Sequence, residues 1–272
     1  MQYSHKEAPV ANPVFNNDKA FKNTYRGDAS ATGTLSPQPS APSVPGFGDS
    51  SVMSYDGVLA KALGLFAFAV VAALGVGILA PFLAFPFLIG ALVLMLVAVF
   101  RKGAPAPGLY IATIGLYGGA AGGISRFYEV EYNGIIMHAL VATACLFAVT
   151  LAVYKSGRIR NVAKIRKFVA IALPAVIVLL IANLVMVLIS GPQASVFEAN
   201  LPGTNIPLGL ILSLFLILLG AFMLIGDFDF VDTGVRNGLP KAYEWTAAFG
   251  LVFTTVWVYI QMLRLLSYLR GR

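Results

Sequence analysis

The chain has 272 residues, of which 58% belong to the hydrophobic set AVILMFWYC and 11% are charged, with a formal net charge of +7. Soluble domains have roughly 25% charged residues, and a globule of this size could not bury so much apolar surface. This excludes a soluble enzyme, an ordinary nucleic-acid-binding protein and a disordered chain. The single cysteine, Cys145, excludes an internal disulfide framework, and His5 and His138 lie too far apart for a metal motif. We therefore expect a membrane protein without a cofactor or a resident metal.

Residues 1–55 differ in composition from the rest of the chain. The window 29–54 consists mostly of Ser, Pro, Gly, Thr and Ala. Such a segment cannot bury enough apolar surface to offset the entropy lost on ordering. The sequence therefore predicts a disordered cytoplasmic tail over residues 1–55, followed by a transmembrane domain over residues 56–272.

Long uncharged runs after the tail predict transmembrane helices. No charged residue lies between Ala62 and Phe100, and a continuous helix of that length would reach nearly twice the roughly 30 Å hydrocarbon thickness. Pro81 and Pro86 near the middle of this run therefore predict a helical hairpin. The complete set of predicted helices is 57–79, 83–101, 106–125, 133–155, 166–190, 206–230 and 241–268, which makes an all-α, seven-helix membrane protein.

The third predicted helix is rich in glycine. Gly115 and Gly119, Gly118 and Gly122, and Gly119 and Gly123 form three overlapping pairs of small residues spaced by four. Faces of this kind let helices approach closely in lipid, so we expect a packing face. The lining of a narrow pore is the alternative.

The Lys and Arg residues predict the orientation of the chain. When the tail is taken as cytoplasmic, only four of the 19 basic residues fall outside, namely Arg126, Arg264, Arg270 and Arg272. Basic residues concentrate in the cytoplasmic loops of membrane proteins. The split predicts a cytoplasmic N-terminus and a C-terminus outside, which requires an odd number of helices.

The loop between the fourth and fifth predicted helices carries six cations within residues 155–167. They are Lys155, Arg158, Arg160, Lys164, Arg166 and Lys167. Such a cluster can bind the anionic head groups of membrane lipids. The alternative, which we favour, is a loop that only sets the topology.

Three carboxylates follow one another closely near the end of the sixth predicted helix. Asp227, Asp229 and Asp232 lie where the helix dipole disfavours negative charge, so a cation is expected to compensate them. The candidates are Arg101, Arg236, Lys241 and a mobile ion. Arg101 ends the second predicted helix on the same side of the membrane, which allows a pair with Asp227. A static cluster of interfacial salt bridges is the alternative.

Several of these segments resemble the Bax inhibitor-1 family, in particular its bacterial YccA-like branch. The resemblance covers roughly residues 56–268, and Asn12–Phe15 in the tail is similar to the start of several bacterial members. The segments that carry it are Gly123–Glu129, Tyr154–Arg160, Asp227–Phe230 and Pro240–Trp245.

The resemblance implies a seven-helix bundle in a bacterial plasma membrane, with the last helix surrounded by the other six. It also implies a pH-sensitive calcium or cation leak, controlled by two facing carboxylates on helices 6 and 7. In the family, an arginine that ends helix 2 pairs with the helix-6 aspartate and closes the cytoplasmic side. Asp227 and Arg101 match this aspartate and arginine. The helix-7 carboxylate falls on Gln261, which cannot ionise, so we expect the leak to depend weakly on pH.

Simple geometry offers a different partner for Asp227. The turn between the last two predicted helices centres near residue 238, so straight antiparallel helices place Gln261 about 18 Å from the level of Asp227, at 1.5 Å per residue. Glu244 is nearly level with Asp227 in the same construction. We therefore keep both Gln261 and Glu244, together with Asp229, as candidates for the ion pathway and the pH sensor.

A second function remains open, that of a membrane scaffold or regulator that binds a membrane protease and transports nothing. The tail and the basic loop would serve such a role. We expect no enzyme, because an intramembrane aspartyl protease needs aspartates within two different helices. The expected partners are membrane lipids, calcium or protons as transported ions, and a membrane protease, and they do not include a nucleic acid.

Overall fold

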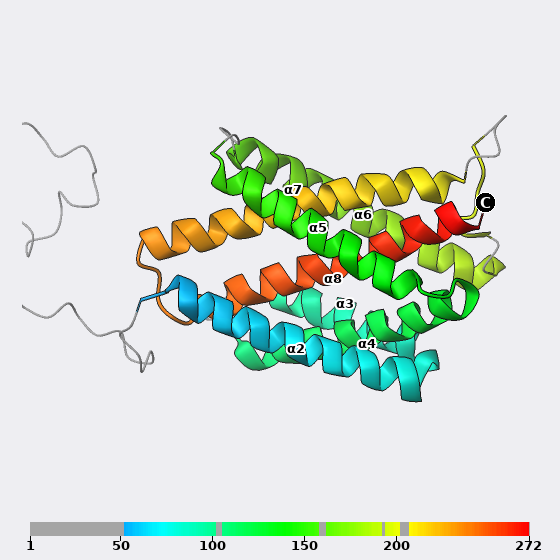
Figure 1. Cartoon of the computed structure of the whole chain (residues 1–272), viewed down its shortest axis with the longest axis horizontal. Coiled ribbons are helices and arrows are strands. Elements are labelled where there is room, and N and C mark those ends of the chain that lie inside the picture. Colours follow the sequence, from blue (N-terminus) through cyan, green and yellow to red (C-terminus); the bar gives the residue numbers. More distant parts are fainter. Residues whose placement is uncertain (1–51, 102–104, 158–161, 192–193, 202–206, 272) are drawn as a thin grey trace, which may run out of the picture. The chain divides into compact units, whose positions relative to one another are not determined.

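The computed structural model of the chain describes residues 52–101, 105–157, 162–191, 194–201 and 207–271. Within these ranges the chain forms seven long α-helices, which confirms the all-α prediction (Figure 1). They are α2 (Tyr55–Leu79), α3 (Ala84–Phe100), α4 (Pro107–Glu131), α5 (Ile135–Lys155), α6 (Val162–Ser190), α7 (Leu208–Arg236) and α8 (Tyr243–Arg270). Residues 1–51 of the predicted tail, and Arg158 and Arg160 of the basic loop, lie outside the described residues.

The predicted hairpin between the first two helices is present. α2 ends at Leu79, and a short 3-10 helix, η1 (Pro81–Leu83), turns the chain into α3. Pro81 occupies the first position of η1, where its missing N–H removes no helical hydrogen bond. Pro81 therefore lies in the predicted turn, and Pro86 lies in the first turn of α3, where a missing N–H is also tolerated.

Two helices end six residues beyond their predicted C-terminal ends, and α6 begins four residues before its predicted start, at Val162. α4 continues past residue 125 to Glu131, and α7 continues past residue 230 to Arg236. In α7 the Arg236 guanidinium lies 3.1 Å from the Asp232 carboxylate one turn earlier, a pairing that supports the last turn of the helix. Asp232 and Arg236, which lie after the predicted end of the sixth helix, thus belong to it.

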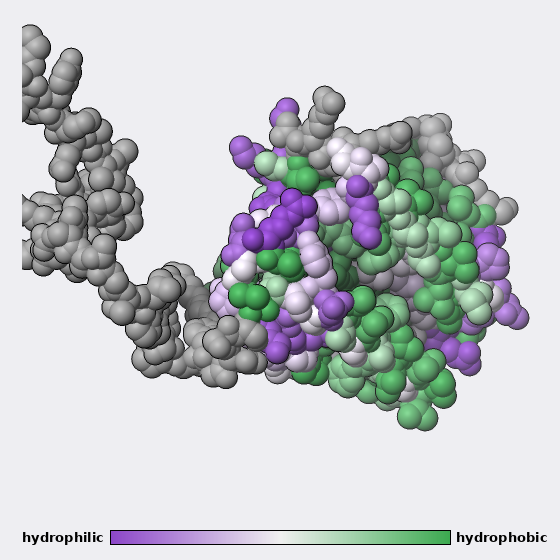
Figure 2. All heavy atoms as spheres, turned by 60° about the vertical axis from the view of Figure 1, so that its left-hand side comes forward, coloured by the Kyte–Doolittle hydropathy of each residue, from purple (hydrophilic) through white to green (hydrophobic). Residues whose placement is uncertain are grey.

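Six helical segments are long and apolar enough to cross a membrane, and α4 is the long helix that does not meet this criterion. Figure 2 shows the hydrophobic residues as a broad green band, with hydrophilic residues in purple gathered at its two ends. A band of this kind matches the hydrocarbon layer between two polar interfaces. The protein is therefore a multi-pass membrane protein.

The helices form two groups that α8 connects. α4 packs against α2 and α3, and α7 packs against α5 and α6. α8 runs between the two groups and contacts α2, α4, α5 and α7 (Figure 1). The expectation that the last helix is surrounded by all six others stays a prediction, because the principal contacts of α8 involve four of them.

The glycine-rich face of α4 packs directly against the backbone of α2. A Cβ atom on Gly118 would lie 2.6 Å from the Ala69 carbonyl oxygen, and a Cβ on Gly122 would collide with the Ala73 carbonyl. Only glycine allows the two backbones to approach so closely. The packing interpretation of this face is confirmed.

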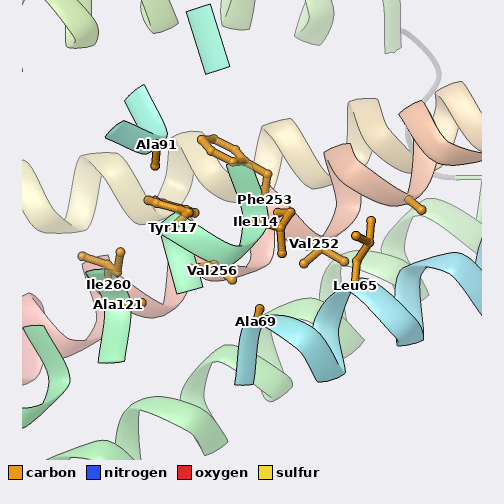
Figure 3. Close-up of a cluster of buried hydrophobic side chains, with 11 residues drawn as sticks. Leu65, Ala69, Ala91, Ile114, Tyr117, Ala121, Val252, Phe253, Val256 and Ile260 are labelled. Carbon is orange, nitrogen blue, oxygen red and sulfur yellow. The ribbon is translucent and has the colours of Figure 1, made fainter. Parts of the chain in front are cut away.

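A cluster of buried side chains fixes α8 against the first helical group (Figure 3). Leu65 of α2 and Ala91 of α3 belong to it, and the Tyr117 ring of α4 stacks on the Phe253 ring of α8 with centroids 4.6 Å apart. Stacked aromatic pairs of this kind add about 1 kcal/mol beyond the area that they bury. Because this face of α8 is engaged, its other side is the one that meets α7.

Candidate functional site

Asp227 lies where α7 meets α8. A Cβ atom on Gly250 of α8 would be 3.0 Å from Asp227 Oδ1, so the missing side chain of Gly250 provides the room for the carboxylate. The side chain of Thr254, one turn further along α8 and only 2% exposed, is hydrogen-bonded to the same carboxylate. Asp227 is thus held against a glycine and a hydroxyl, neither of which can carry a charge.

The second oxygen of Asp227 is not satisfied. Asp227 as a residue is partly exposed, but its Oδ2 atom is buried and has no hydrogen-bond partner among the described residues. Asp227 lies about 13 Å before the end of α7, at 1.5 Å per residue, which places it inside a membrane-spanning helix. A buried polar atom without a partner costs free energy, and such atoms concentrate at sites that bind something.

The structure does not bring Asp227 together with either of its predicted partners. Gly250 lies about 9 Å along α8 from Glu244, and Thr254 lies about 10 Å from Gln261, at 1.5 Å per residue. The expectation that Glu244 is nearly level with Asp227 is corrected by this offset. The physical reason is that α7 and α8 are joined by a short turn, so a residue well inside α7 meets one well inside α8, whereas Glu244 lies in the first turn.

Glu244 has a separate and complete set of partners. Its side chain is 0% exposed, Oε2 forms an ion pair with Lys61 of α2, and Oε1 accepts hydrogen bonds from the backbone N–H and the hydroxyl of Ser54 at 2.9 and 3.1 Å. A Cβ on Gly57 would collide with this carboxylate. Glu244 therefore ties the start of α8 to the start of α2.

The segment before α2 strengthens this tie. The Met53 N–H donates a 2.7 Å hydrogen bond to the Leu239 carbonyl oxygen, and Val52 forms an isolated β-bridge with Pro240 in the turn between α7 and α8. The Met53 side chain is 2% exposed. Residues 52–54, which the sequence assigned to the tail, thus belong to the packed helical unit. We call Val52–Ser54, Lys61 and Glu244 the inner clamp.

Gln261 lies near the opposite end of α8. It is 4% exposed, and its Oε1 accepts a long hydrogen bond of 3.4 Å from Arg264. The Arg264 guanidinium in turn stacks over the Phe197 ring at 4.2 Å from its centroid. Gln261 therefore belongs to a polar contact at the end of the bundle where α8 finishes.

The cations near the acidic cluster pair with residues other than Asp227. Arg166 of α6 forms an ion pair with Asp229, and Arg236 pairs with Asp232, which also accepts a 2.7 Å hydrogen bond from the Tyr55 hydroxyl. Arg101 is exposed at the C-terminal end of α3, and the described residues contain no ion pair between it and Asp227. Among the described residues, Arg236, which the sequence proposed, and Arg166, which it placed in the basic loop, are thus two of the compensating cations.

A family model described as Bax inhibitor 1 like matches residues 12–271. The chain belongs to the Bax inhibitor 1 like family. No curated protein matches the chain. The family match covers all seven helices of this Bax inhibitor 1 like protein, so both the Asp227 site and the inner clamp lie within the matched region.

A long groove of this Bax inhibitor 1 like protein is lined by Phe228 and Thr255, the chain neighbours of Asp227 and Thr254, whereas Asp227 itself does not line it. It has a volume of about 1660 Å³ and is lined by α2, α4, α5, α7 and α8. Asp229, Asp232, Lys155 and Arg236 line one end, and Arg126 and Glu129 line the other, with apolar side chains and a few hydroxyl groups between. The groove therefore extends along the helices from one polar end of the bundle to the other.

Sequence reasoning missed Thr254 and Gly250 at the Asp227 site, and it missed Lys61 and Val52–Ser54 of the inner clamp. Thr254 and Gly250 gave no signal, because a threonine and a glycine in an apolar helix are ordinary. Lys61 did give one, since it lies about 9 Å inside α2, at 1.5 Å per residue, where an unpaired cation would be costly. That cost requires a buried carboxylate nearby, and Glu244 is the carboxylate that meets it.

Proposed function

We propose that this protein is a pH-modulated calcium or cation leak channel of a bacterial plasma membrane, and that Asp227 is the carboxylate on which the ion or a proton rests. The observation that carries the proposal is the buried Asp227 Oδ2 atom, which lacks a hydrogen-bond partner among the described residues. Ionisable groups inside a membrane are costly, and they mark ion pathways and proton relays. A cation or a proton would supply the partner that this oxygen lacks.

The groove beside Asp227 supports this role. Lys155 and Arg236 line the same end as Asp229 and Asp232, so this entrance is polar and gives a hydrated ion access to the groove. Hydroxyl groups of Ser125, Thr143 and Thr255 line its apolar middle and can replace part of the water around an ion. With the tail in the cytoplasm, this charged end of the groove faces the cytoplasm.

The gate in this proposal is an ion pair between Arg101 and Asp227, which forms in a closed state and is absent from the arrangement described above. A single titratable group then controls the leak, because Gly250 and Thr254 face Asp227 on α8. Two facing carboxylates would share a proton and respond steeply to pH. A single carboxylate lacks this coupling, so we propose that the leak depends only weakly on pH between about pH 6 and 8.

Flux measurements with the full-length protein test this function. The purified protein is reconstituted in liposomes that contain a calcium-sensitive dye, and calcium entry is followed at several pH values. The wild-type protein should conduct, and Asp227→Asn should change the initial rate at least fivefold. The rate falls where loss of the ion-binding charge dominates, and it rises where loss of the closing pair with Arg101 dominates. Asp56→Asn, the same chemical change at an exposed position outside the site, should leave the rate unchanged. Equal rates in both variants would remove Asp227 from the pathway.

The same experiment separates the leak from the alternative function. A scaffold or regulator of a membrane protease, in the manner proposed for the tail and the basic loop, would give no flux with the wild-type protein. Lys155, Lys164 and Lys167 are exposed and favour contact with lipid head groups or a partner at this loop. We also propose that the protein belongs to the YccA-like branch of the family and that its last helix is surrounded by the other six.

A further inference from the structure

Three side chains meet where the long groove reaches the end of the bundle at which α2 begins. α5 and α7 finish at this same end (Figure 1). The Tyr55 hydroxyl of α2 donates a 2.7 Å hydrogen bond to Asp232 Oδ1, and the Tyr154 hydroxyl of α5 donates a longer one of 3.4 Å to Asp232 Oδ2. All three residues line the groove. One carboxylate of α7 thus connects two walls of the groove that belong to different helical groups. We call these three residues the tyrosine bridge.

An aromatic layer lies beside the tyrosine bridge. The Tyr154 ring packs against the Phe228 ring of α7 with centroids 5.9 Å apart, and the Phe147 ring of α5 packs edge-on against Phe228 at 5.3 Å. Phe147 and Phe228 both line the groove, and Phe228 is only 8% exposed. Apolar constrictions hold back water and ions until they widen. An ion that enters the groove between the charged residues therefore meets aromatic side chains next.

The tyrosine bridge fixes how α7 is rotated about its own axis. Phe228 and Asp232 lie one turn apart on the same face of α7, and this face lines the groove. Asp227 precedes Phe228 by one residue, which corresponds to about 100° around the helix, and it faces α8 instead. By holding Asp232 at the groove, the two tyrosines keep Phe228 in the groove and Asp227 away from it.

The ion pairs in this part of α7 restrain it in a different way. Arg236 pairs with Asp232 within α7 and turns with the helix, so this pair does not fix the rotation. Arg166 pairs with Asp229, but it belongs to α6, which is in the same helical group as α7. The tyrosine bridge differs because Tyr55 belongs to α2, on the opposite side of the groove.

We propose that Tyr55 and Tyr154 are gating residues of the leak, which hold α7 in the rotation that keeps Asp227 out of the groove. When the bridge parts, α7 turns, the Phe228 ring leaves the groove and the Asp227 carboxylate enters it. A carboxylate that does not line the groove can in this way receive an ion that travels along it. This role rests on the proposed leak function. It is separate from the pair between Arg101 and Asp227, because the bridge is present in the described arrangement.

Calcium entry into liposomes that contain the full-length protein measures the gate. Tyr55→Phe removes one hydroxyl and keeps the ring, and it should raise the initial rate about fivefold, because a two-state equilibrium loses one net hydrogen bond. Tyr154→Phe should raise the rate less, since its hydrogen bond is longer. Tyr110→Phe is the matched control and should leave the rate unchanged, because its hydroxyl lies outside the groove, 3.2 Å from Thr246. Equal rates in Tyr55→Phe and Tyr110→Phe would overturn the proposal.

Thiol labelling detects the rotation of α7 without a flux measurement. In a Cys145→Ser background, Asp227→Cys should react slowly with a methanethiosulfonate reagent, and the addition of Tyr55→Phe should speed the reaction about fivefold. The addition of Tyr110→Phe should not. Faster labelling with Tyr55→Phe, in a protein whose wild type carries no calcium, would retain the rotation and remove the leak function. Calcium entry in the wild type, with labelling that Tyr55→Phe does not change, would remove the gate and retain the leak.

A double-mutant comparison shows whether Tyr55 acts through the carboxylate of the bridge. Asp232→Ala removes the acceptor that both tyrosines share. Tyr55→Phe should therefore speed the labelling of Asp227→Cys when Asp232 is present, and it should have no further effect in the Asp232→Ala protein. An equal effect of Tyr55→Phe in both proteins would contradict the bridge as the restraint on α7.

Discussion

Glu244 of α8 and Asp227 of α7 lie in opposite kinds of environment. In the inner clamp, Glu244 is completely buried and each of its oxygens has a partner on α2 or just before it. At the Asp227 site, one oxygen is hydrogen-bonded to Thr254 and the other is buried without a partner among the described residues. The first carboxylate is electrically compensated, and the second is not.

This difference indicates which carboxylate stabilises the fold and which is available for function. A buried charge with complete partners holds the elements together, because the loss of either partner leaves the other uncompensated. A buried carboxylate with a free oxygen lowers the stability of the protein unless something binds to it. The clamp therefore predicts a large effect of mutation on unfolding, and the Asp227 site predicts a small one.

The largest effect is expected at the clamp. Glu244→Gln should lower the free energy of unfolding by about 3 kcal/mol, because it leaves Lys61 without its counter-charge. The measurement is denaturant unfolding in detergent, followed by helical circular dichroism. Glu131→Gln, at an exposed position at the end of α4, is the control and should change stability by less than about 0.5 kcal/mol. Similar losses in both proteins would contradict a structural role for the clamp.

A second carboxylate opposite Asp227 should convert the site into a steep pH sensor. Gly250→Asp places a like charge beside Asp227 and should cost about 2 kcal/mol of stability at pH 8. The cost should fall as the pH is lowered, because protonation of either group removes the repulsion, and the calcium leak should become strongly pH-dependent. Gly250→Asn has a similar size without the charge. If its stability and leak vary with pH as strongly as those of Gly250→Asp, Asp227 is not facing this position.

Removal of the charge on Asp227 should have a small effect of the opposite sign. Asp227→Asn should leave the stability unchanged or raise it by up to about 1 kcal/mol, because the amide lowers the cost of burial and can still bond to Thr254. The same unfolding assay as for Glu244→Gln provides the comparison. A loss as large as that of Glu244→Gln would mean that Asp227 has a partner essential to the fold.

The smallest effect is expected for the ion pair between Arg166 and Asp229. The Arg166 side chain is 62% exposed, so water and salt screen the interaction. Arg166→Gln should cost no more than about 1 kcal/mol, and the cost should vanish at high salt. Unfolding curves at low and high sodium chloride concentration measure this. A salt-independent loss would place the pair in a more buried setting than the one described.

The sequence by itself determined the class of protein and most of the helix pattern. The uncharged runs predicted seven helices, Pro81 predicted the hairpin, and the glycine spacing of α4 predicted its close packing against another helix. These features are local, since the length of an apolar run, a missing N–H and a missing Cβ act on the chain segment that contains them. The resemblance of several segments to the Bax inhibitor-1 family was also sufficient to identify the family that the comparison confirms.

Only the tertiary structure decided which residues meet. Asp227 faces Gly250 and Thr254, while Glu244 turns to Lys61 and Ser54, and neither pairing follows from the pattern along one helix. In a membrane protein, side chains that face lipid and side chains that face other helices are both apolar, so the hydrophobic pattern does not fix how one helix is rotated or shifted against the next. A shift of six residues moves a side chain by about 9 Å along a helix, and that distance separates a compensated carboxylate from an available one.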